Sequence, residues 1–308
     1  MSPGPTTLAV RAGIARDVAH GAVSPPLHLS ANFAFAGFGQ KRAYDYTRSG
    51  NPTRDELGGA LAALEGGAGC VVTSSGMAAV SLVLQLLEPG DLLVLPHDCY
   101  GGTWRLASAL AGKGRFELAV IDQGDAAQLA AAMRRRPKLV WAETPSNPLL
   151  RLVDLAALAA ACRQHGALFA VDNTFLSPAR QNPIALGADI VVHSTTKYVN
   201  GHSDVVGGAV IAREPSLHEQ LAWWANAHGI TGAPFDAWLT LRGLRTLEAR
   251  LRIHERNAKR VAEMLAAHPD VARVHYPGLP SHPDHELARR QQRGFGGMLS
   301  FELRDPTA

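Results

Sequence analysis

Lys197 stands out because the chain uses lysine so rarely. Among its 308 residues there are 25 arginines and only 5 lysines, so arginine fills most positions where any cation would serve. Lys197 follows a short apolar run and the hydroxyl residues Ser194 and Thr196. Only an amine can form a Schiff base with a carbonyl compound, because a guanidinium stays protonated. Lys197 is therefore a candidate for covalent catalysis. The alternative is a surface lysine whose aliphatic stem lies along the protein.

Three other features suit cofactor chemistry. Asp172 ends an apolar run and could hold a cofactor cation, or it could form the turn after a strand. Ser75, Gly76 and Met77 open a helical stretch, where free backbone N–H groups can hold a phosphate. On local sequence alone, ordinary helix capping by Ser74 or Ser75 is the favoured alternative. Tyr100 follows another apolar run and could stack on an aromatic ligand or simply pack. The glycines match neither a P-loop nor a dinucleotide fingerprint.

An amine, a carboxylate, a phosphate-binding helix start and an aromatic side chain are the parts that pyridoxal 5′-phosphate (PLP) needs. Lys197 would form the Schiff base with the cofactor aldehyde. Asp172 would keep the pyridine nitrogen protonated, so that the ring accepts electrons. His193 is expected to be a satisfied core histidine. His282 and His285 have no accompanying ligand cluster in the sequence, so no metal site is expected.

Apolar runs alternate with helical periodicities along the middle of the chain. The expected helices cover 53–64, 76–87, 103–110, 125–133 and 152–165. The expected strands cover 70–73, 92–96, 118–121, 139–143, 168–172, 190–193 and 208–211. This alternation predicts an α/β fold with a mostly parallel sheet. Ligands of such sheets bind outside the carboxyl ends of the strands. The polar residues after five of these strands should therefore form one site.

The chain divides into three predicted parts. Residues 1–60 lack a period and form an arm that we expect to contact a neighbouring subunit. Residues 61–245 form the α/β domain, which would bind the cofactor. Residues 246–308 begin an α+β domain, with one long helix expected over 241–268 and strands over 271–276 and 297–303. Two strands make a thin domain, so the chain is expected to be truncated at its C-terminal end.

The composition excludes several classes of protein. Hydrophobic residues make up 46% and charged residues 19%, as in a packed globular protein. The net charge is +3 and no run of five basic residues occurs, so no nucleic-acid partner is expected. No apolar stretch reaches the roughly 18 residues of a membrane span. The three widely spaced cysteines predict reduced thiols and a cytoplasmic protein.

Several long motifs resemble the Cys/Met-metabolism family of PLP-dependent enzymes, and the resemblance covers essentially the whole chain. They are YDYTRSGNPTRD at 44–55, TSSGMA at 73–78, PHDCYGG at 96–102, ETPSNPLL at 143–150, VDNTFLS at 171–177, HSTTKYVNGHSD at 193–204, AWWAN at 222–226 and RGFGGMLSFEL at 293–303. The last two look particularly like the γ-synthase branch of that family. The resemblance implies the fold type I, aspartate aminotransferase-like architecture.

The resemblance also assigns roles to residues that match the family's motifs. Lys197 would be the Schiff-base lysine and proton shuttle, Asp172 the partner of the pyridinium, and Tyr100 the residue that stacks on the ring. The other implied cofactor contacts are Gly76, Met77, Ser194, Thr196 and Asn147, with Tyr46 and Arg48 reaching the phosphate of a neighbouring subunit. The residues implied at the substrate entrance are Asp45, Arg105 and Asn226. Family members are usually homotetramers built as dimers of dimers.

The implied reaction is a γ-replacement on O-succinyl-L-homoserine by L-cysteine, giving cystathionine and succinate for methionine biosynthesis. A cystathionine β- or γ-lyase and an O-acylhomoserine sulfhydrylase remain open on the same scaffold. So does a catalytically impaired subunit, because family sequences continue beyond Ala308. The arginine that grips the substrate carboxylate lies in that continuation. The expected partners are thus small acylated amino acids and cysteine, with no nucleic acid and no membrane.

Overall fold

The structure is a computed structural model that describes residues 3–305, and it consists of two compact units. The first unit is the chain up to Leu86 together with Ile190–Leu247. The second is Leu87–Asp189 together with the chain from Glu248 onward. The three predicted parts follow the sequence, whereas each unit joins two separate stretches of chain. The three-part division stays a prediction.

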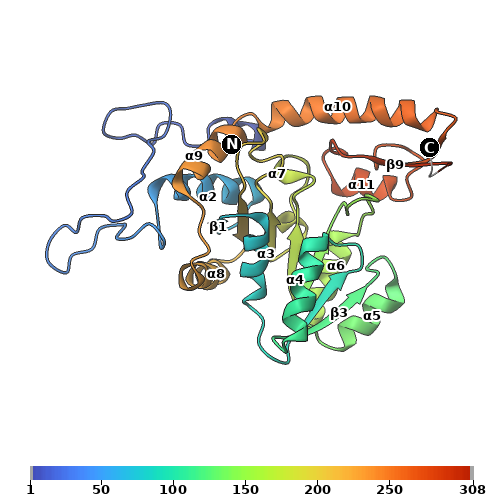
Figure 1. The fold of residues 1–308 in the computed structure, drawn as a ribbon, viewed down its shortest axis with the longest axis horizontal. Helices are drawn as coiled ribbons and strands as arrows, with labels where there is room; N and C mark the ends of the chain where they lie inside the picture. Colours follow the sequence, from blue (N-terminus) through green and yellow to red (C-terminus); the bar gives the residue numbers. More distant parts are fainter. Residues whose placement is uncertain (1–2, 306–308) are drawn as a thin grey trace. The chain divides into compact units, whose positions relative to one another are not determined.

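The first unit is built on strands β1 (Gly69–Thr73), β6 (Ile190–His193) and β7 (Gly208–Ala212). β7 lies between the other two and runs antiparallel to both, with Cys70 opposite Ile211 and His193 opposite Ala209. The helices of this unit include α2 (Pro52–Glu65), α3 (Gly76–Leu84), α8 (Pro215–His228) and α9 (Pro234–Leu244) (Figure 1). All three strands begin and end within one or two residues of their predicted bounds.

Helix α2 shows why the predicted bounds hold. Asn51 caps it by accepting hydrogen bonds from the backbone N–H groups of Thr53 and Arg54, and proline occupies the first helical position. Gly66 ends it in the left-handed conformation, at a φ of 79°. The apolar face buries Leu57 and Leu61 almost completely. Capping and periodicity agree, so the helix begins and ends where its local sequence directs.

The second unit contains a parallel sheet of four strands in the order β5-β4-β2-β3. The strands are β2 (Leu92–Pro96), β3 (Glu117–Ile121), β4 (Leu139–Glu143) and β5 (Leu168–Asp172). Helices α4 (Gly101–Gly112), α5 (Ala126–Arg134) and α6 (Leu155–His165) connect them. β2 and β4 are buried along their whole length. They are continuous apolar runs because both of their faces are covered.

The predicted helix over 241–268 is wrong, because the chain forms two helices there. α9 ends at Leu244 and α10 (Leu247–Ala266) follows after a turn at residues 245–246. Gly243 lies so close to the Asn200 carbonyl that a Cβ would come within 2.0 Å of it. The Thr246 hydroxyl donates to the Gly243 carbonyl at 3.0 Å, and such a side-chain bond competes with helix continuation. Neither contact is visible in the local sequence.

The second unit also contains α7 (Ser177–Arg180), the short helix Ile184–Leu186, β8 (Val271–His275), α11 (His285–Gln291) and β9 (Ser300–Leu303). β8 and β9 pair antiparallel. The buried Arg180 ties α7 to α10 through ion pairs with Glu248 at 2.8 Å and Glu255 at 2.9 Å. This segment therefore docks through charged contacts as well as through its apolar cluster around Tyr276.

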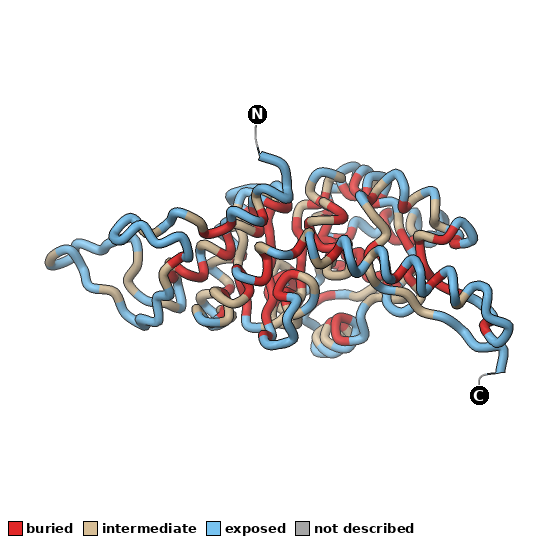
Figure 2. Tube along the Cα trace, turned by 90° about the horizontal axis from the view of Figure 1, so that it is seen from above, coloured by how far each residue is buried: buried red, intermediate tan, exposed pale blue. Residues whose placement is uncertain are grey.

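The arm is largely irregular, as predicted, apart from the short helix α1 (Pro5–Val10) and isolated bridges such as Asn32 to Tyr46. Most of residues 27–50 are exposed, which appears as the pale loops of Figure 2. Within residues 3–305, none of the helices combines the length and the apolar character that crossing a bilayer requires.

Candidate functional site

The start of helix α3 in the first unit meets the chain after β6. Ser75 caps the helix, since its hydroxyl accepts from the Ala78 N–H at 3.0 Å. The backbone N–H groups of Gly76 and Met77 have no partner among the residues that the structure describes. A Cβ on Gly76 would lie 2.7 Å from Cβ and 2.9 Å from Oγ of Ser194. A glycine is thus required here, and two free amides lie near a serine hydroxyl.

The loop that carries Lys197 is held by its own residues. The Thr196 hydroxyl accepts from the Gly207 N–H at 3.0 Å and donates to the Gly207 carbonyl at 3.2 Å. The Lys197 N–H bonds to the Ser194 carbonyl at 3.2 Å. Lys197 is exposed, and within the described residues its amine makes no hydrogen bond or ion pair. The loop therefore fixes its backbone and leaves the amine available.

Four of the predicted residues form a second cluster in the first unit. Arg48 Nη1 donates to both the backbone and the side-chain oxygen of Asn226 on α8, each at 2.7 Å. The Arg48 guanidinium also lies 5.5 Å from the centre of the Tyr46 ring. Asp45 accepts from the Tyr46 N–H at 2.7 Å, and its ion pair with Lys41 lowers the pKa of that carboxyl. The hydrogen bonds between Arg48 and Asn226 thus join the arm to α8, although the two segments are far apart in the sequence.

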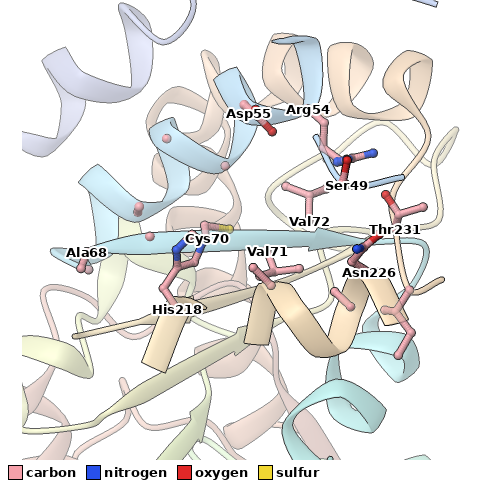
Figure 3. Close-up of a pocket in the computed structure, with 18 of the residues that line it drawn as sticks. Ser49, Arg54, Asp55, Ala68, Cys70, Val71, Val72, His218, Asn226 and Thr231 are labelled. Atoms are coloured by element: carbon pink, nitrogen blue, oxygen red, sulfur yellow. The ribbon is translucent and has the colours of Figure 1, made fainter. Parts of the chain in front are cut away.

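A cavity of about 540 Å³ opens beside this cluster (Figure 3). Its walls come from α2, β1 and α8, and Arg48 and Asn226 both line it. Small residues on α2, including Gly58 and Gly59, leave it open. Figure 3 shows Cys70 and His218 on its floor and Arg54 and Asp55 above them. Arg54 is held by the carbonyl groups of Thr47 and Gly232, so it supports the arm.

In the second unit the ends of β4 and β5 place two carboxyl groups side by side. Glu143 and Asp172 are register partners on these parallel strands. The Glu143 carboxyl accepts from the Tyr100 N–H at 2.6 Å, which fixes the start of α4. Burial raises the pKa of Glu143 well above its usual range, and the charge of Asp172 raises that pKa further. Both effects favour the neutral form of Glu143, while Asp172 accepts from the Thr174 N–H at 2.9 Å.

The other predicted residues of this unit lie close to the same strand ends. Asn147 is exposed in the loop after β4. The residue after it, Pro148, accepts a hydrogen bond at its carbonyl from the Ser300 hydroxyl on β9 at 2.5 Å. Arg105 lies one turn into α4, and a Cβ on Gly101 would come within 3.2 Å of its guanidinium. Nine of the predicted residues thus lie in the first unit, and Tyr100, Arg105, Asn147 and Asp172 lie in the second.

The sequence did not reveal two buried carboxyl groups. Glu143 was recognised only as the end of a strand, and its buried position gives it a contact with Tyr100. Glu65, at the end of α2, bonds to His193 at 2.7 Å, and both side chains are fully buried. His193 is thus a core histidine, as predicted, although only its Nε2 is bonded, and its Nδ1 has no partner among the described residues. A charged residue inside an apolar pattern was the only available signal for either carboxyl group.

The three cysteines are free thiols, as predicted. Burial raises the pKa of the Cys99 thiol to about 12, and Glu143 and Asp98 add to the shift. Burial likewise raises the pKa of Cys162 to about 12. For Cys70, burial and then Glu65 raise the pKa even further. All three side chains therefore stay protonated at neutral pH.

Comparison with known proteins agrees with this chemistry. A family model described as Cys/Met metabolism PLP-dependent enzyme matches residues 6–308. Cystathionine gamma-synthase of Escherichia coli (strain K12) is 56% identical over 298 residues, which are 96% of this chain and 77% of that protein.

Two solved structures share the fold. One is cystathionine gamma synthase of Xanthomonas oryzae pv. oryzae in complex with cystathionine, with a TM-score of 0.99 and 63% identity. The match covers the whole of this chain and 80% of that one. The other is cystathionine gamma-lyase of Lactobacillus plantarum complexed with L-serine, with a TM-score of 0.95 and 40% identity over 99% of this chain and 80% of that one. Both matches confirm the predicted α/β fold. This chain belongs to the Cys/Met-metabolism family of PLP-dependent enzymes.

Proposed function

We propose that the chain is a cystathionine γ-synthase, which joins O-succinyl-L-homoserine and L-cysteine to give cystathionine and succinate. The observation that carries the proposal is the match to the Xanthomonas enzyme in complex with cystathionine, at 63% identity over the whole chain. The identity of 56% to the Escherichia coli synthase supports it independently. Within the chain, AWWAN at 222–226 supplies Asn226, which the structure bonds to Arg48.

The cofactor of the family is PLP, and the residues of this chain fit it. A phosphate needs free N–H groups near a hydroxyl, and the start of α3 offers the amides of Gly76 and Met77 beside Ser194. A Cβ at position 76 would fill that place. Thr196 supports the same loop through Gly207. Asp172 would hold the pyridinium and Asn147 the phenolate side, while Tyr100 would stack on the ring.

Lys197 is the residue that would hold the cofactor covalently and then move protons. Its exposed amine would take the proton from Cα of the bound substrate and return one when the product forms. When bound, PLP supplies an electron sink for the charge that deprotonation leaves. Asp172 would stabilise the protonated ring nitrogen. The neutral Glu143 beside it keeps the local negative charge on Asp172.

The arm cluster would complete the site of a second copy. Tyr46 and Arg48 would reach the phosphate of a neighbouring subunit, and Asp45, Asn226 and Arg105 would line the substrate entrance. The exposed arm and the joint between Arg48 and Asn226 support this arrangement. We propose a homotetramer built as a dimer of dimers. The free, protonated thiols support a cytoplasmic setting.

The test starts from the purified chain with PLP. A band near roughly 420 nm that borohydride converts into a stable adduct on Lys197 would support the cofactor assignment. Product analysis should then give cystathionine from acylhomoserine and cysteine. The Lys197→Ala variant should lose both the band and turnover. Turnover by this variant near the wild-type rate would remove Lys197 from the mechanism, and the absence of cystathionine would remove the synthase assignment.

A lyase is the second candidate, because the Lactobacillus cystathionine gamma-lyase shares the fold at a TM-score of 0.95. A lyase would use water to cleave cystathionine, giving ammonia together with either pyruvate and homocysteine or 2-oxobutyrate and cysteine. Incubating the enzyme with cystathionine alone separates the two. Rapid release of an oxoacid favours a lyase, whereas its absence together with cystathionine formation favours the synthase.

A further inference from the structure

Three amide side chains in the second unit, two of them buried and one half-buried, form a continuous chain of hydrogen bonds. Asn173 directly follows Asp172 at the end of β5, Gln181 follows α7, and Gln291 ends α11. Asn173 and Gln181 are 0% and 1% exposed. Asn173 and Gln181 are 8 positions apart, whereas Gln291 is separated from Gln181 by 110 positions. We call these three residues the amide relay.

Gln181 is the centre of the amide relay. Its Nε2 donates to the Thr144 carbonyl and to Asn173 Oδ1, each at 3.1 Å. Asn173 Nδ2 returns a bond to the Gln181 carbonyl at 2.9 Å. Gln181 thereby links the loop after β4, which carries Asn147, to Asn173, which directly follows Asp172 at the end of β5. Both donor hydrogens of the amide are used, so the side chain has one orientation.

Gln291 ties this centre to α11. Its Nε2 donates to Gln181 Oε1 at 3.1 Å and to the Val153 carbonyl at 3.2 Å. Its Oε1 accepts from the Leu155 N–H at 2.8 Å, which is the first helical amide of α6. A fully satisfied buried network specifies one arrangement, because any shift leaves a polar group without a partner.

We propose that Gln181 and Gln291 are positioning residues for the cofactor, and that through them α11 sets the placement of the Asp172 and Asn147 loops. Neither side chain is proposed to touch the cofactor. The inference rests on the proposed roles of Asp172 and Asn147. It predicts that a change on α11 alters cofactor binding although α11 supplies no cofactor contact.

The chain contains a matched control next to Gln291. Gln292 is 8% exposed, and neither polar atom of its side chain has a hydrogen-bond partner within the described residues. Gln291→Leu removes three hydrogen bonds and leaves buried partners unsatisfied, whereas Gln292→Leu removes none. The two variants change the same residue type at adjacent positions.

The experiment measures the dissociation constant of PLP by fluorescence, the pH at which the cofactor band titrates, and the melting temperature without PLP. Gln291→Leu and Gln181→Leu should each weaken PLP binding by about tenfold and shift the titration of the band. Gln292→Leu should bind PLP like the wild type. The double variant Gln181→Leu/Gln291→Leu should lose less PLP-binding free energy than the sum of the losses of the two single variants, because the two residues act through one network.

Lower melting temperatures with unchanged PLP affinity and band titration would make the relay purely structural and overturn the inference. Equal effects of Gln291→Leu and Gln292→Leu would overturn it too. If Gln181→Leu does not fold, the half-buried Gln291 still provides the comparison with Gln292. A wild type that forms no borohydride-stable adduct on Lys197 would overturn the proposed function and this inference together. If the wild type forms the adduct on Lys197 and the variants bind PLP as tightly as the wild type, the inference alone would be overturned.

Discussion

Glu143 is a carboxyl group whose pKa the fold raises well above its usual range. It is buried next to Asp172, and it accepts one backbone N–H from Tyr100. Two neighbouring carboxyl groups cannot both ionise cheaply in a buried place, so one of them holds its proton. Because Asp172 is the group that would face a pyridinium, the proton on Glu143 leaves the charge where the proposed chemistry needs it.

Glu143→Gln should make the free energy of unfolding less dependent on pH. An acid whose pKa is raised by folding binds more protons in the folded chain than in the unfolded chain. Its contribution to stability therefore declines as the pH rises above the ordinary glutamate value of about 4.3. Glutamine keeps an oxygen for the Tyr100 N–H but carries no such proton. In urea unfolding without PLP, the free energy of unfolding of the variant relative to that of the wild type should increase as the pH rises.

The exposed Glu117, which pairs with Arg135 at the surface, provides the control for that measurement. Glu117→Gln should leave the pH dependence of the wild type unchanged. Parallel pH profiles for the wild type and Glu143→Gln would show that Glu143 ionises normally in the folded chain.

Gly76→Ala should weaken PLP binding by about tenfold or more, because the new methyl group meets Ser194 at 2.7 Å. Relief of that overlap moves either the α3 start or the Ser194 loop, and both are proposed to hold the phosphate. PLP fluorescence titration measures the effect. Gly112→Ala is the control, since nothing lies within 4 Å of a Cβ there. Wild-type affinity in Gly76→Ala would place the phosphate elsewhere.

At the scale of elements, the buried contact between Glu65 and His193 joins α2 to β6. α2 begins just after the arm, and β6 ends just before the Lys197 loop. The two side chains lie 2.7 Å apart and are fully buried, so neither can exchange its partner for water. One helix therefore spans from the arm to the strand that presents the proposed catalytic lysine.

Glu65→Leu should lower the free energy of unfolding by about 3 kcal/mol, because it leaves a buried His193 without its partner. The double variant Glu65→Leu/His193→Leu should recover part of this loss, since two apolar groups leave nothing unsatisfied. Chemical unfolding of both variants measures the difference. Asp270→Leu, in the exposed pair with His268, should change stability little. An unchanged free energy of unfolding in the Glu65→Leu variant would contradict a stabilising role for the pair.

Local sequence was sufficient for elements whose signals are local. Strands β2, β4, β5 and β6 match the predicted ranges residue for residue, because each is an apolar run bounded by turn formers. The separate α9 and α10 were missed, since the break depends on the approach of Gly243 to Asn200. Helix α8 was not predicted either, although its AWWAN segment was recognised as a motif.

The site shows the same limit. Lys197 and Asp172 were found because they end apolar strands, where ligands of α/β sheets bind. Each of Glu143, Gln181 and Gln291 has a partner far away along the chain. The separation is 43 positions from Glu143 to Tyr100, 110 from Gln181 to Gln291, and 136 from Gln291 to Leu155. No spacing rule connects such residues. Contacts of this kind become visible only when the fold brings the segments together.

At the scale of the whole molecule, the arm leaves large apolar side chains in solvent. Leu29, Phe35 and Phe38 are 68%, 48% and 107% exposed. Several exposed apolar side chains on one segment mark a surface that a partner covers. A second copy of the chain is the partner that the proposed site requires.

Backbone hydrogen exchange of residues 27–50 should slow as the protein concentration rises and larger species appear in sedimentation. The cause is burial of the arm by a second copy, which withdraws its amides from water. The exposed turn at 268–270 should exchange equally fast at all concentrations. A monomer that turns over substrate with an unprotected arm would contradict the shared site.

The burial of the three thiols has a consequence for work with a thiol substrate. Cysteine oxidises readily to cystine, and cystine is attacked by thiolates rather than by thiols. Cys99 and Cys162, whose pKa values are raised to about 12, contain almost no thiolate at neutral pH, and Cys70 contains still less. The protein thus resists mixed disulfides with the oxidised form of its proposed nucleophile. A change in the redox state of that substrate pool should therefore leave the protein's own thiols unmodified.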